Sequence, residues 1–318
     1  MKEPNIIIYG SMAHDRILNF PGRFADHILK DKIHVLSVSF GISEFNDNYG
    51  GTAGNIAYNL SLLKQQANII AAIGKDDDKY RLWLKFNNLS QAGIEGVPNE
   101  PTALVYIFTD RDDNQIAGFY PGAMKKTVKV RLSEMMKKNS FNYLLLAPGN
   151  KNDIIRLGSE AQKLEIPYMF DPGQSLPLFN KSELRKLIDG ADILISNDYE
   201  LSMIEKITGW KAGTIEEKVH ILITTLGPKG SVVRHGKKCY RISAGKPKNE
   251  SDPTGAGDAF RAGFLTGYLN GKDLKDSARL GSTVSLYTVE KYGTQTHQFN
   301  LKQIKNRYYK NYKSKISL

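Results

Sequence analysis

Short apolar runs recur along this chain and alternate with stretches of helical periodicity. Ile56, Leu60 and Leu63 fall on one helical face, and a similar stripe runs from Ile154 to Leu164. Runs this short and uninterrupted suit strands that are buried on both faces of a parallel sheet. The runs are Ile6 to Tyr9, Ile69 to Ile73, Tyr143 to Leu146, Tyr168 to Phe170, Ile193 to Ile195 and Ile221 to Thr224. The alternation predicts an α/β fold in which a mostly parallel sheet is flanked by helices.

Two regions depart from this alternation. Residues 16–49 are rich in aromatic and β-branched side chains but lack helical periodicity. Residues 103–109 and 115–120 predict two strands around an Asp-Arg-Asp-Asp-Asn turn. Antiparallel pieces inserted in a parallel sheet would form a small β-sheet lid or a dimerisation sheet. Because no linker or internal repeat is evident, we expect one domain, 1–318, whose lid is formed by about 13–50 and 98–122.

Composition raises a second class of function. The formal net charge is +11, and basic residues and tyrosines interleave between Lys302 and Lys315, a pattern that can bind single-stranded nucleic acid. We instead expect a terminal helix whose tyrosine face packs on the domain, and no nucleic-acid partner.

The single cysteine, Cys239, fits a reducing cytoplasm. The first ten residues lack the pattern of a signal peptide, and no apolar run is long enough for a membrane helix. We therefore expect a cytoplasmic protein without a membrane partner.

The segment from Asp252 to Asp258 is the strongest candidate for chemistry. Phe260, Phe264 and Tyr268 recur at helical spacing, so a helix begins near Asp258. Small residues before a helix N-terminus let backbone amides converge on an anion, and a carboxylate there can take the proton of an attacking hydroxyl. The alternative is a glycine turn in which Asp258 caps the helix.

A second candidate segment runs from Gly50 to Asn55 and leads into the helix that carries Ile56. Paired glycines allow a ligand to approach the backbone closely, and Asn55 offers both a donor and an acceptor to vicinal hydroxyls. A flexible turn with an asparagine cap is equally compatible with the local sequence.

These two segments resemble the two motifs of the PfkB, or ribokinase-like, carbohydrate kinases, whose fold has a mostly parallel sheet and a small β lid. The second motif is usually Asp-Thr-x-Gly-Ala-Gly-Asp, and Pro253 replaces its threonine here. Asn197 to Glu200 resembles the family's Asn-x-x-Glu element, and Thr225 to Gly230 resembles its nucleotide loop. The motifs occur in the family's order between Gly10 and about Gln295. Within the family, the chain is most similar to bacterial adenosine kinases in the stretches Gly10 to Asp15, Phe20 to Phe24, Phe119 to Met124, Asn197 to Glu200 and Phe260 to Phe264.

The resemblance implies a division of catalytic roles. Asp258 would be the general base that deprotonates the acceptor's 5′-hydroxyl. The backbone amides of Gly255, Ala256 and Gly257 would stabilise charge on the γ-phosphoryl group.

The resemblance also implies an acceptor site. The ribose hydroxyls would be held by Asp15, Gly51 and Asn55, with Ser11 nearby. Such partners would reject deoxy analogues, since unpaired buried polar groups are costly. On the alternative interpretation, Asp15 caps a strand end.

The resemblance implies that the purine of the nucleoside stacks on Phe119, with Ser39 and Gln174 near it. A second aromatic is expected on the preceding lid strand, but Val105 stands there and Tyr106 would point to the opposite face. Phe119 could instead be a core residue of the lid.

For ATP, the resemblance implies that Thr225, Gly227 and Gly230 line the ribose and phosphate path. Asn197 and Glu200 would act on Mg²⁺ through water, which suits the retained hydration of this ion. The local alternatives are a capping pair for Asn197 and a strand-end turn for the loop.

Taken together, the resemblance implies an adenosine kinase that forms AMP in purine salvage. The alternative is another kinase of this family, acting on inosine, guanosine, cytidine, ribose or fructose. ATP and Mg²⁺ would be required, and some relatives also bind K⁺, to which Asp252 could contribute. The lid strands would pair two subunits into a homodimer.

Overall fold

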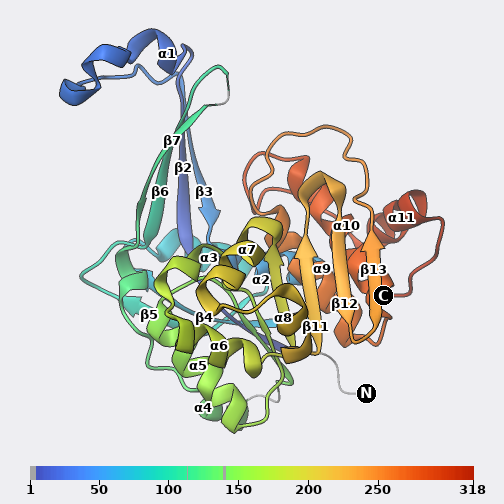
Figure 1. The fold of residues 1–318 in the computed structure, drawn as a ribbon. Helices are drawn as coiled ribbons and strands as arrows, with labels where there is room; N and C mark the ends of the chain where they lie inside the picture. Colours follow the sequence, from blue (N-terminus) through green and yellow to red (C-terminus); the bar gives the residue numbers. More distant parts are fainter. Residues whose placement is uncertain (1–4, 113, 139–140) are drawn as a thin grey trace.

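Two β-sheets organise the chain (Figure 1). The computed structural model describes residues 5–112, 114–138 and 141–318. The larger sheet has nine strands in the order β13-β12-β11-β10-β9-β8-β1-β4-β5, and the smaller has four in the order β3-β2-β6-β7. Strands β11 to β5 in this order run parallel, whereas β12 and β13 are antiparallel. The expected α/β fold with a mostly parallel sheet is confirmed.

The large sheet takes its strands from the whole length of the chain. Its strands are β1 (Asn5–Tyr9), β4 (Gln66–Gly74), β5 (Ser90–Val97), β8 (Tyr143–Leu146), β9 (Tyr168–Phe170), β10 (Ile193–Asn197), β11 (Ile221–Thr225), β12 (Ser231–His235) and β13 (Lys238–Ile242). The helices that flank it are α2 (Thr52–Leu62), α3 (Asp78–Phe86), α4 (Leu132–Lys138), α5 (Lys151–Lys163), α6 (Lys181–Asp189), α7 (Asp198–Thr208), α8 (Ala212–Lys218), α9 (Ala256–Leu269), α10 (Leu274–Val289) and α11 (Leu301–Tyr312). Short 3₁₀ turns are η2 (Gly122–Lys125), η3 (Gly173–Leu178) and η4 (Gly227–Lys229).

Each face of the large sheet has its own apolar core. Alternate strand residues pack against α2, α9 and α10 on one face and against α4 to α8 on the other. In β1, Ile6 and Ile8 belong to the first core and Ile7 to the second, as the period of two requires. Leu164, expected on the buried stripe of α5, instead follows the helix as its C-cap and is 37% exposed.

The small sheet projects from the body of the molecule (Figure 1). It consists of β2 (Ala13–Asn19), β3 (Glu44–Gly50), β6 (Ala103–Thr109) and β7 (Gln115–Tyr120), so the two strands expected around the Asp-rich turn are confirmed. Asp113 of that turn lies outside the described residues. Helix α1 (Phe24–His27) and the turn η1 (Lys30–Val35) lie at the far end of this sheet.

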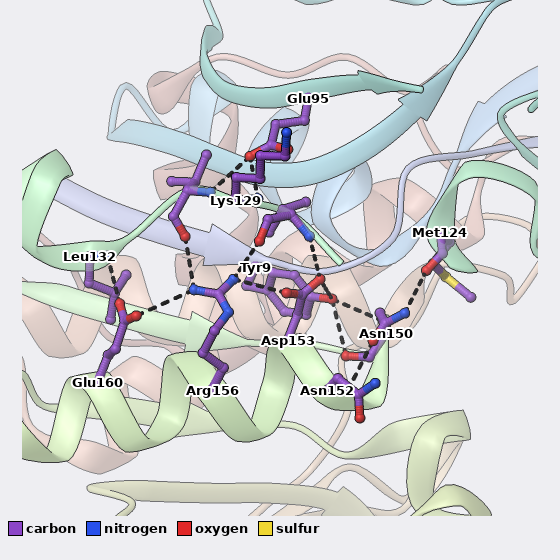
Figure 2. A network of polar contacts seen from close by, with 12 residues as sticks. Tyr9, Glu95, Met124, Lys129, Leu132, Asn150, Asn152, Asp153, Arg156 and Glu160 are labelled. Atoms are coloured by element: carbon purple, nitrogen blue, oxygen red, sulfur yellow. Dashed lines mark hydrogen bonds and ion pairs between the residues drawn. The ribbon is translucent and has the colours of Figure 1, made fainter. Parts of the chain in front are cut away.

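A polar network fixes the segment that returns from the small sheet to the body (Figure 2). The buried Asp153 of α5 accepts a hydrogen bond from the Val128 amide at 3.0 Å and pairs with Arg156 at 2.9 Å. Arg156 in turn donates to the carbonyls of Val128 and Val130 at 3.0 and 2.9 Å. Asn150, the N-cap of α5, reaches the Met124 carbonyl at 3.1 Å. The segment that leads from β7 of the small sheet back to the large sheet is therefore bound to α5.

The C-terminal stretch forms α11, as expected from its tyrosines. Tyr308 is fully buried and Tyr312 packs beside it at 5.3 Å between ring centroids, whereas Tyr309 is exposed and does not share the packed face. Arg307 pairs with Glu290 of the α10 C-cap and helps to hold this helix on the domain.

Within the described residues, none of the helices combines the length and the apolar character that spanning a bilayer requires.

Candidate active site

A cleft of about 550 Å³ opens at the carboxyl edge of the large sheet. Ser11 and Asp171 follow β1 and β9, while Asn197 and Thr225 end β10 and β11, and all four line this cleft. The crevice outside the carboxyl ends of parallel strands is where open α/β sheets bind ligands. The small sheet closes one side, through residues of β2, β6 and β7.

Asp258 enters the cleft from the first turn of α9. The helix begins at Ala256 with Gly255 as N-cap in the left-handed region (φ 77°), so Asp258 sits at the third helical position and is not the cap. Gly255, Gly257 and Asp258 line the cleft, but Ala256 is not among the lining residues and its amide donates to the Pro253 carbonyl at 3.2 Å. Amides of a first helical turn lack helical partners and carry partial positive charge. The arrangement suits an anion beside Asp258, with Ala256 contributing less than expected.

The carboxylate of Asp258 is held by Asn55. Asn55 Nδ2 donates to Asp258 Oδ2 at 2.8 Å, although the two residues are 203 positions apart. Asn55 lies within α2, which begins at Thr52, and therefore does not cap that helix. Burial raises the pKa of Asp258 to about 6, and the charge of Asp15 adds to the rise, while Arg261 and the Asn55 bond oppose it. A carboxylate with such a pKa can accept a proton near neutral pH.

Asp15 faces the same cleft from the middle of β2, so it is not a strand-end cap. Burial raises its pKa to about 6, with contributions from the charges of Asp252 and Asp47. Gly51, the N-cap of α2 at φ 85°, packs so closely on this region that a Cβ would lie 2.6 Å from the Ser11 carbonyl oxygen. Asp15 and Gly51 line the cleft together with Asn55 and Ser11. Their binding of ribose hydroxyls stays a prediction from the resemblance.

One wall of the cleft is apolar. Phe119 and Val105 pair across β7 and β6 and both line the cleft, and Gln174 lies there as well. Tyr106 points to the other face, where Arg16 Nη1 donates to its hydroxyl at 2.8 Å. Phe119 is 55% exposed, which excludes a packed lid core around it in this structure.

Ser39 is not brought to the cleft. It is exposed and belongs to the connection between η1 and β3. Strands β2 and β3 pair from Ala13↔Gly50 at the cleft to Asn19↔Glu44 at the far end. That connection therefore begins about 20 Å along the strands, at roughly 3.3 Å per residue.

The opposite end of the cleft carries the Asn-x-x-Glu element. Asn197 caps α7, and a reciprocal capping box joins it to Glu200 through bonds of 2.7 and 2.8 Å. Both side chains also line the cleft, so capping and ligand contact are compatible. Burial raises the pKa of Glu200, while its bond from the Asn197 amide opposes the rise.

The loop after β11 lies only partly at the cleft. Thr225 and Gly227 line the cleft. Gly230 does not; its amide donates to the Gly227 carbonyl at 2.9 Å, and a Cβ there would lie 1.9 Å from the Ile242 carbonyl oxygen. Gly230 therefore forms the turn into β12 rather than the cleft wall.

An ion pair at the base of the cleft was missed by sequence reasoning. Asp171 receives Arg261 through Nη2–Oδ1 at 2.7 Å and Nε–Oδ2 at 2.5 Å, and both side chains are more than nine-tenths buried. A Cβ on Gly257 would lie 2.6 Å from Arg261 Nη1, so the guanidinium lies against the first turn of α9. Two signals were available: Asp171 directly follows a parallel strand, and Arg261 lies one helical turn after Asp258.

Asp252, the side chain expected to contribute to a K⁺ site, bonds to its own loop. Its oxygens accept from the amides of Thr254 at 2.9 Å and Gly293 at 3.1 Å. These bonds hold the loop before α9 against the turn after α10. Binding of K⁺ stays a prediction from the resemblance alone.

The chain is similar to known kinases over nearly its whole length. A family model described as pfkB family carbohydrate kinase matches residues 22–300. A protein named nucleoside kinase from Methanothermobacter thermautotrophicus is 32% identical over 90% of this chain and 93% of its own length. The solved nucleoside kinase of Burkholderia thailandensis in complex with inosine has a TM-score of 0.86 and 32% identity, and covers 98% of this chain and 99% of its own. The Methanocaldococcus jannaschii nucleoside kinase has a TM-score of 0.85 and 28% identity, with 97% and 99% covered.

Proposed function

Because this chain belongs to the pfkB family of carbohydrate kinases, we propose that it transfers the γ-phosphate of ATP to the 5′-hydroxyl of a nucleoside, with adenosine the preferred acceptor. The observation that carries this proposal is the carboxylate of Asp258 in the first turn of α9. It accepts a hydrogen bond from Asn55 of α2, and burial raises its pKa to about 6. It faces a cleft that also contains Asp15 and the Asn-x-x-Glu pair. Names of nucleoside kinases among the relatives support the acceptor class.

The proposed reaction follows from the positions of these groups. Asp258 takes the proton of the 5′-hydroxyl as the oxygen forms a bond to the γ-phosphorus. The bond from that phosphorus to the bridging oxygen of ATP breaks, and ADP leaves with the electron pair. Asp15 and Asn55 orient the ribose, while the free amides of the first turn of α9 stabilise charge on the transferring group.

The residues of the cleft fit a magnesium ion that is held through water. Because the capping box occupies Asn197 Oδ1 and one oxygen of Glu200, one Glu200 oxygen remains for a hydrated ion. Within the described residues, no cluster of three His, Cys, Asp or Glu side chains could hold a metal. Mg²⁺ bound with the phosphates would neutralise part of their charge.

Arg261 supplies positive charge from the protein. Among the described residues that line the cleft, four carry carboxylates, and Arg261 is the basic one. Its guanidinium is oriented by Asp171 and lies against Gly257, beside the amides proposed for the γ-phosphoryl group. We assign to Arg261 the stabilisation of charge on that group during transfer.

The nucleobase is the part of the acceptor to which the cleft offers the fewest specific contacts. Phe119 provides one apolar surface, while Val105 provides less stacking than an aromatic would. The amide of Gln174 can donate or accept, so it can satisfy the edge of adenine or of hypoxanthine. For these reasons inosine, guanosine and cytidine remain the alternative acceptors, and the inosine complex of the B. thailandensis relative supports that alternative.

A competition assay tests the proposed acceptor. Adenosine, inosine, guanosine, cytidine, ribose and fructose are supplied together with MgATP, and the products are separated by mass. The proposal predicts that adenosine 5′-monophosphate forms fastest. Faster phosphorylation of another nucleoside would overturn the preference for adenosine, and phosphorylation of ribose or fructose alone would overturn the acceptor class.

Activity is expected to fall steeply with acid. Asp258 must be ionised to act as base and Asp15 to hold the ribose, and the pKa of each is raised to about 6. The logarithm of kcat/KM is therefore expected to be flat above that pH and to fall with a slope approaching about 2 below it. Asp15→Asn should reduce this slope to about 1.

The matched control for the pH profile is Asp47→Asn, because Asp47 is half-exposed and pairs with Arg16 on the lid. Its profile should retain the wild-type slope, and its midpoint should move to lower pH only to the extent that the charge of Asp47 raises the pKa of Asp15. A wild-type acid limb with a midpoint near the ordinary pKa of aspartate would contradict the assignment.

We also propose that the small sheet, contributed by residues within 13–50 and 98–122 of one domain, is a lid that pairs two subunits in a cytoplasmic homodimer. Apolar side chains more than half exposed at its end and edge support this: Leu29, Ile33, Val35, Leu36 and Phe45. Light scattering should give twice the chain mass, and a monomer at micromolar concentration would contradict the pairing.

A further inference from the structure

We propose that Gln295, oriented by the indole of Trp83, is a positioning residue that directs the amide of Asn55 onto Asp258 and so keeps the base ionised. The expected effect on turnover rests on the proposed function, whereas the expected effect on the pKa of Asp258 does not. Gln295 lies in the turn between α10 and α11, a segment in which the sequence motifs place no functional residue.

Four side chains from four separate parts of the chain form a continuous relay of hydrogen bonds. Trp83 Nε1 donates to Gln295 Oε1 at 2.8 Å. Gln295 Nε2 donates to Asn55 Oδ1 at 3.0 Å, and Asn55 Nδ2 donates to Asp258 Oδ2 at 2.8 Å. Gln295 and Asn55 are 3% and 5% exposed, so these bonds have little competition from water.

The direction of the relay is set at Trp83. An indole N–H can only donate, so it requires the oxygen of the Gln295 amide to face it. The NH₂ group of Gln295 then faces Asn55, which must present its own oxygen to it. Asn55 is left with its NH₂ group toward Asp258. A reversed Asn55 would set NH₂ against NH₂ and oxygen against carboxylate.

Tyr80 strengthens the same orientation. Its hydroxyl donates to the Gly50 carbonyl at 2.7 Å and accepts from Gln295 Nε2 at 2.9 Å. Tyr80 is fully buried, and Gly50 ends the lid strand β3. The relay therefore also connects the root of the lid with the residue that holds the base.

The relay lowers the pKa of Asp258. The bond from Asn55 stabilises the carboxylate and opposes the rise of its pKa that burial causes. Loss of the relay removes the constraint on Asn55, so the pKa of Asp258 rises further. Turnover then declines at acid pH and recovers at alkaline pH, which a general loss of structure would not produce.

Two substitutions remove the relay at different points. Trp83→Phe deletes the indole N–H while keeping a ring against Tyr49, whose centroid is 5.4 Å away. Gln295→Leu deletes both ends of the amide. The matched controls are Trp210→Phe, since the other tryptophan lies over Arg185, and Gln298→Leu, since Gln298 bonds to Tyr58 in the same segment.

Two readouts are taken on the full chain: the pKa of the Asp258 carboxyl by ¹³C NMR without substrate, assigned with Asp258→Asn, and the pH profile of kcat/KM, which reports the free enzyme. We expect both relay variants to raise the pKa of Asp258 by about 0.5–1 unit, with kcat/KM falling about 2–6-fold near pH 6 and little at high pH. Both controls should match wild type.

The outcomes separate the inference from the proposed function. An unchanged Asp258 pKa in Trp83→Phe and Gln295→Leu overturns the inference, even in an active kinase. A raised pKa in a protein that phosphorylates no nucleoside supports the positioning of Asp258 and overturns the proposed function instead. If Gln295→Leu does not fold, Trp83→Phe decides alone.

Discussion

Asp258→Asn is expected to lower kcat by about 10²–10⁴-fold while leaving nucleoside affinity within a few-fold of wild type. Asparagine has the shape of aspartate and can still accept the bond from Asn55, so the ribose and phosphate contacts stay in place. It cannot accept the proton of the attacking hydroxyl. Turnover by stopped assay and nucleoside affinity by calorimetry measure the two quantities separately.

Stability supplies the control for Asp258→Asn. Because burial raises the pKa of Asp258 in the folded protein, its ionised form disfavours the native state above about pH 6. Removal of this carboxyl should leave the melting temperature at neutral pH unchanged or higher. Near-wild-type turnover in Asp258→Asn would mean that another group accepts the proton.

Arg261→Met is expected to impair stability and turnover together. It strands Asp171 without its buried partner, and breaking such a pair costs about 3–5 kcal/mol in the free energy of unfolding. Burial already raises the pKa of Asp171, and loss of Arg261 raises it further, so the variant should lose stability as pH rises. Turnover should fall at least about 100-fold through loss of charge stabilisation.

A double variant separates these two effects. Arg261→Met with Asp171→Leu replaces the pair by apolar side chains and should recover most of the stability measured by urea unfolding. It should not recover turnover, since the positive charge beside Gly257 is still missing. Recovery of kcat in the double variant would assign Arg261 a purely structural role.

The buried pair Arg307–Glu290 provides the matched control for the Arg261 experiment. Its members are each 9% exposed and join α11 to the end of α10. Arg307→Met should therefore destabilise the protein without lowering kcat in the folded fraction. Comparison of Arg307→Met with Arg261→Met therefore separates the effect of losing a charge in the cleft from the effect of losing a buried ion pair.

Much of the fold could be predicted from local pattern. The buried strands near Ile6, Tyr143 and Tyr168 each reveal themselves by an uninterrupted apolar run, because both faces of the sheet are covered. The lid strand β3 (Glu44–Gly50) was harder, since its exposed face and its asparagines give no such run. Ser39 shows a related limit. The resemblance points to this residue, but it does not predict that the long connection between β2 and β3 places Ser39 away from the cleft.

The candidate site divides in the same way. Asp258 and Asn55 stand in glycine-rich motifs, so their importance could be anticipated, but their mutual bond spans 203 positions and required the fold. Arg261 and Asp171 carry weaker signals, a helical spacing and a strand end. Gln295 carries none, because its role depends on partners from α2 and α3 and not on its neighbours in sequence.

The central claim is that this cleft transfers a phosphoryl group to a nucleoside hydroxyl, and transfer of label tests it most directly. Folded protein is incubated with ATP labelled at the γ-phosphate, Mg²⁺ and adenosine or another nucleoside, and the labelled product is identified. The account predicts label in a nucleoside 5′-monophosphate, formed with ADP. Label found in inorganic phosphate alone, or retained in ATP with every nucleoside, would contradict it.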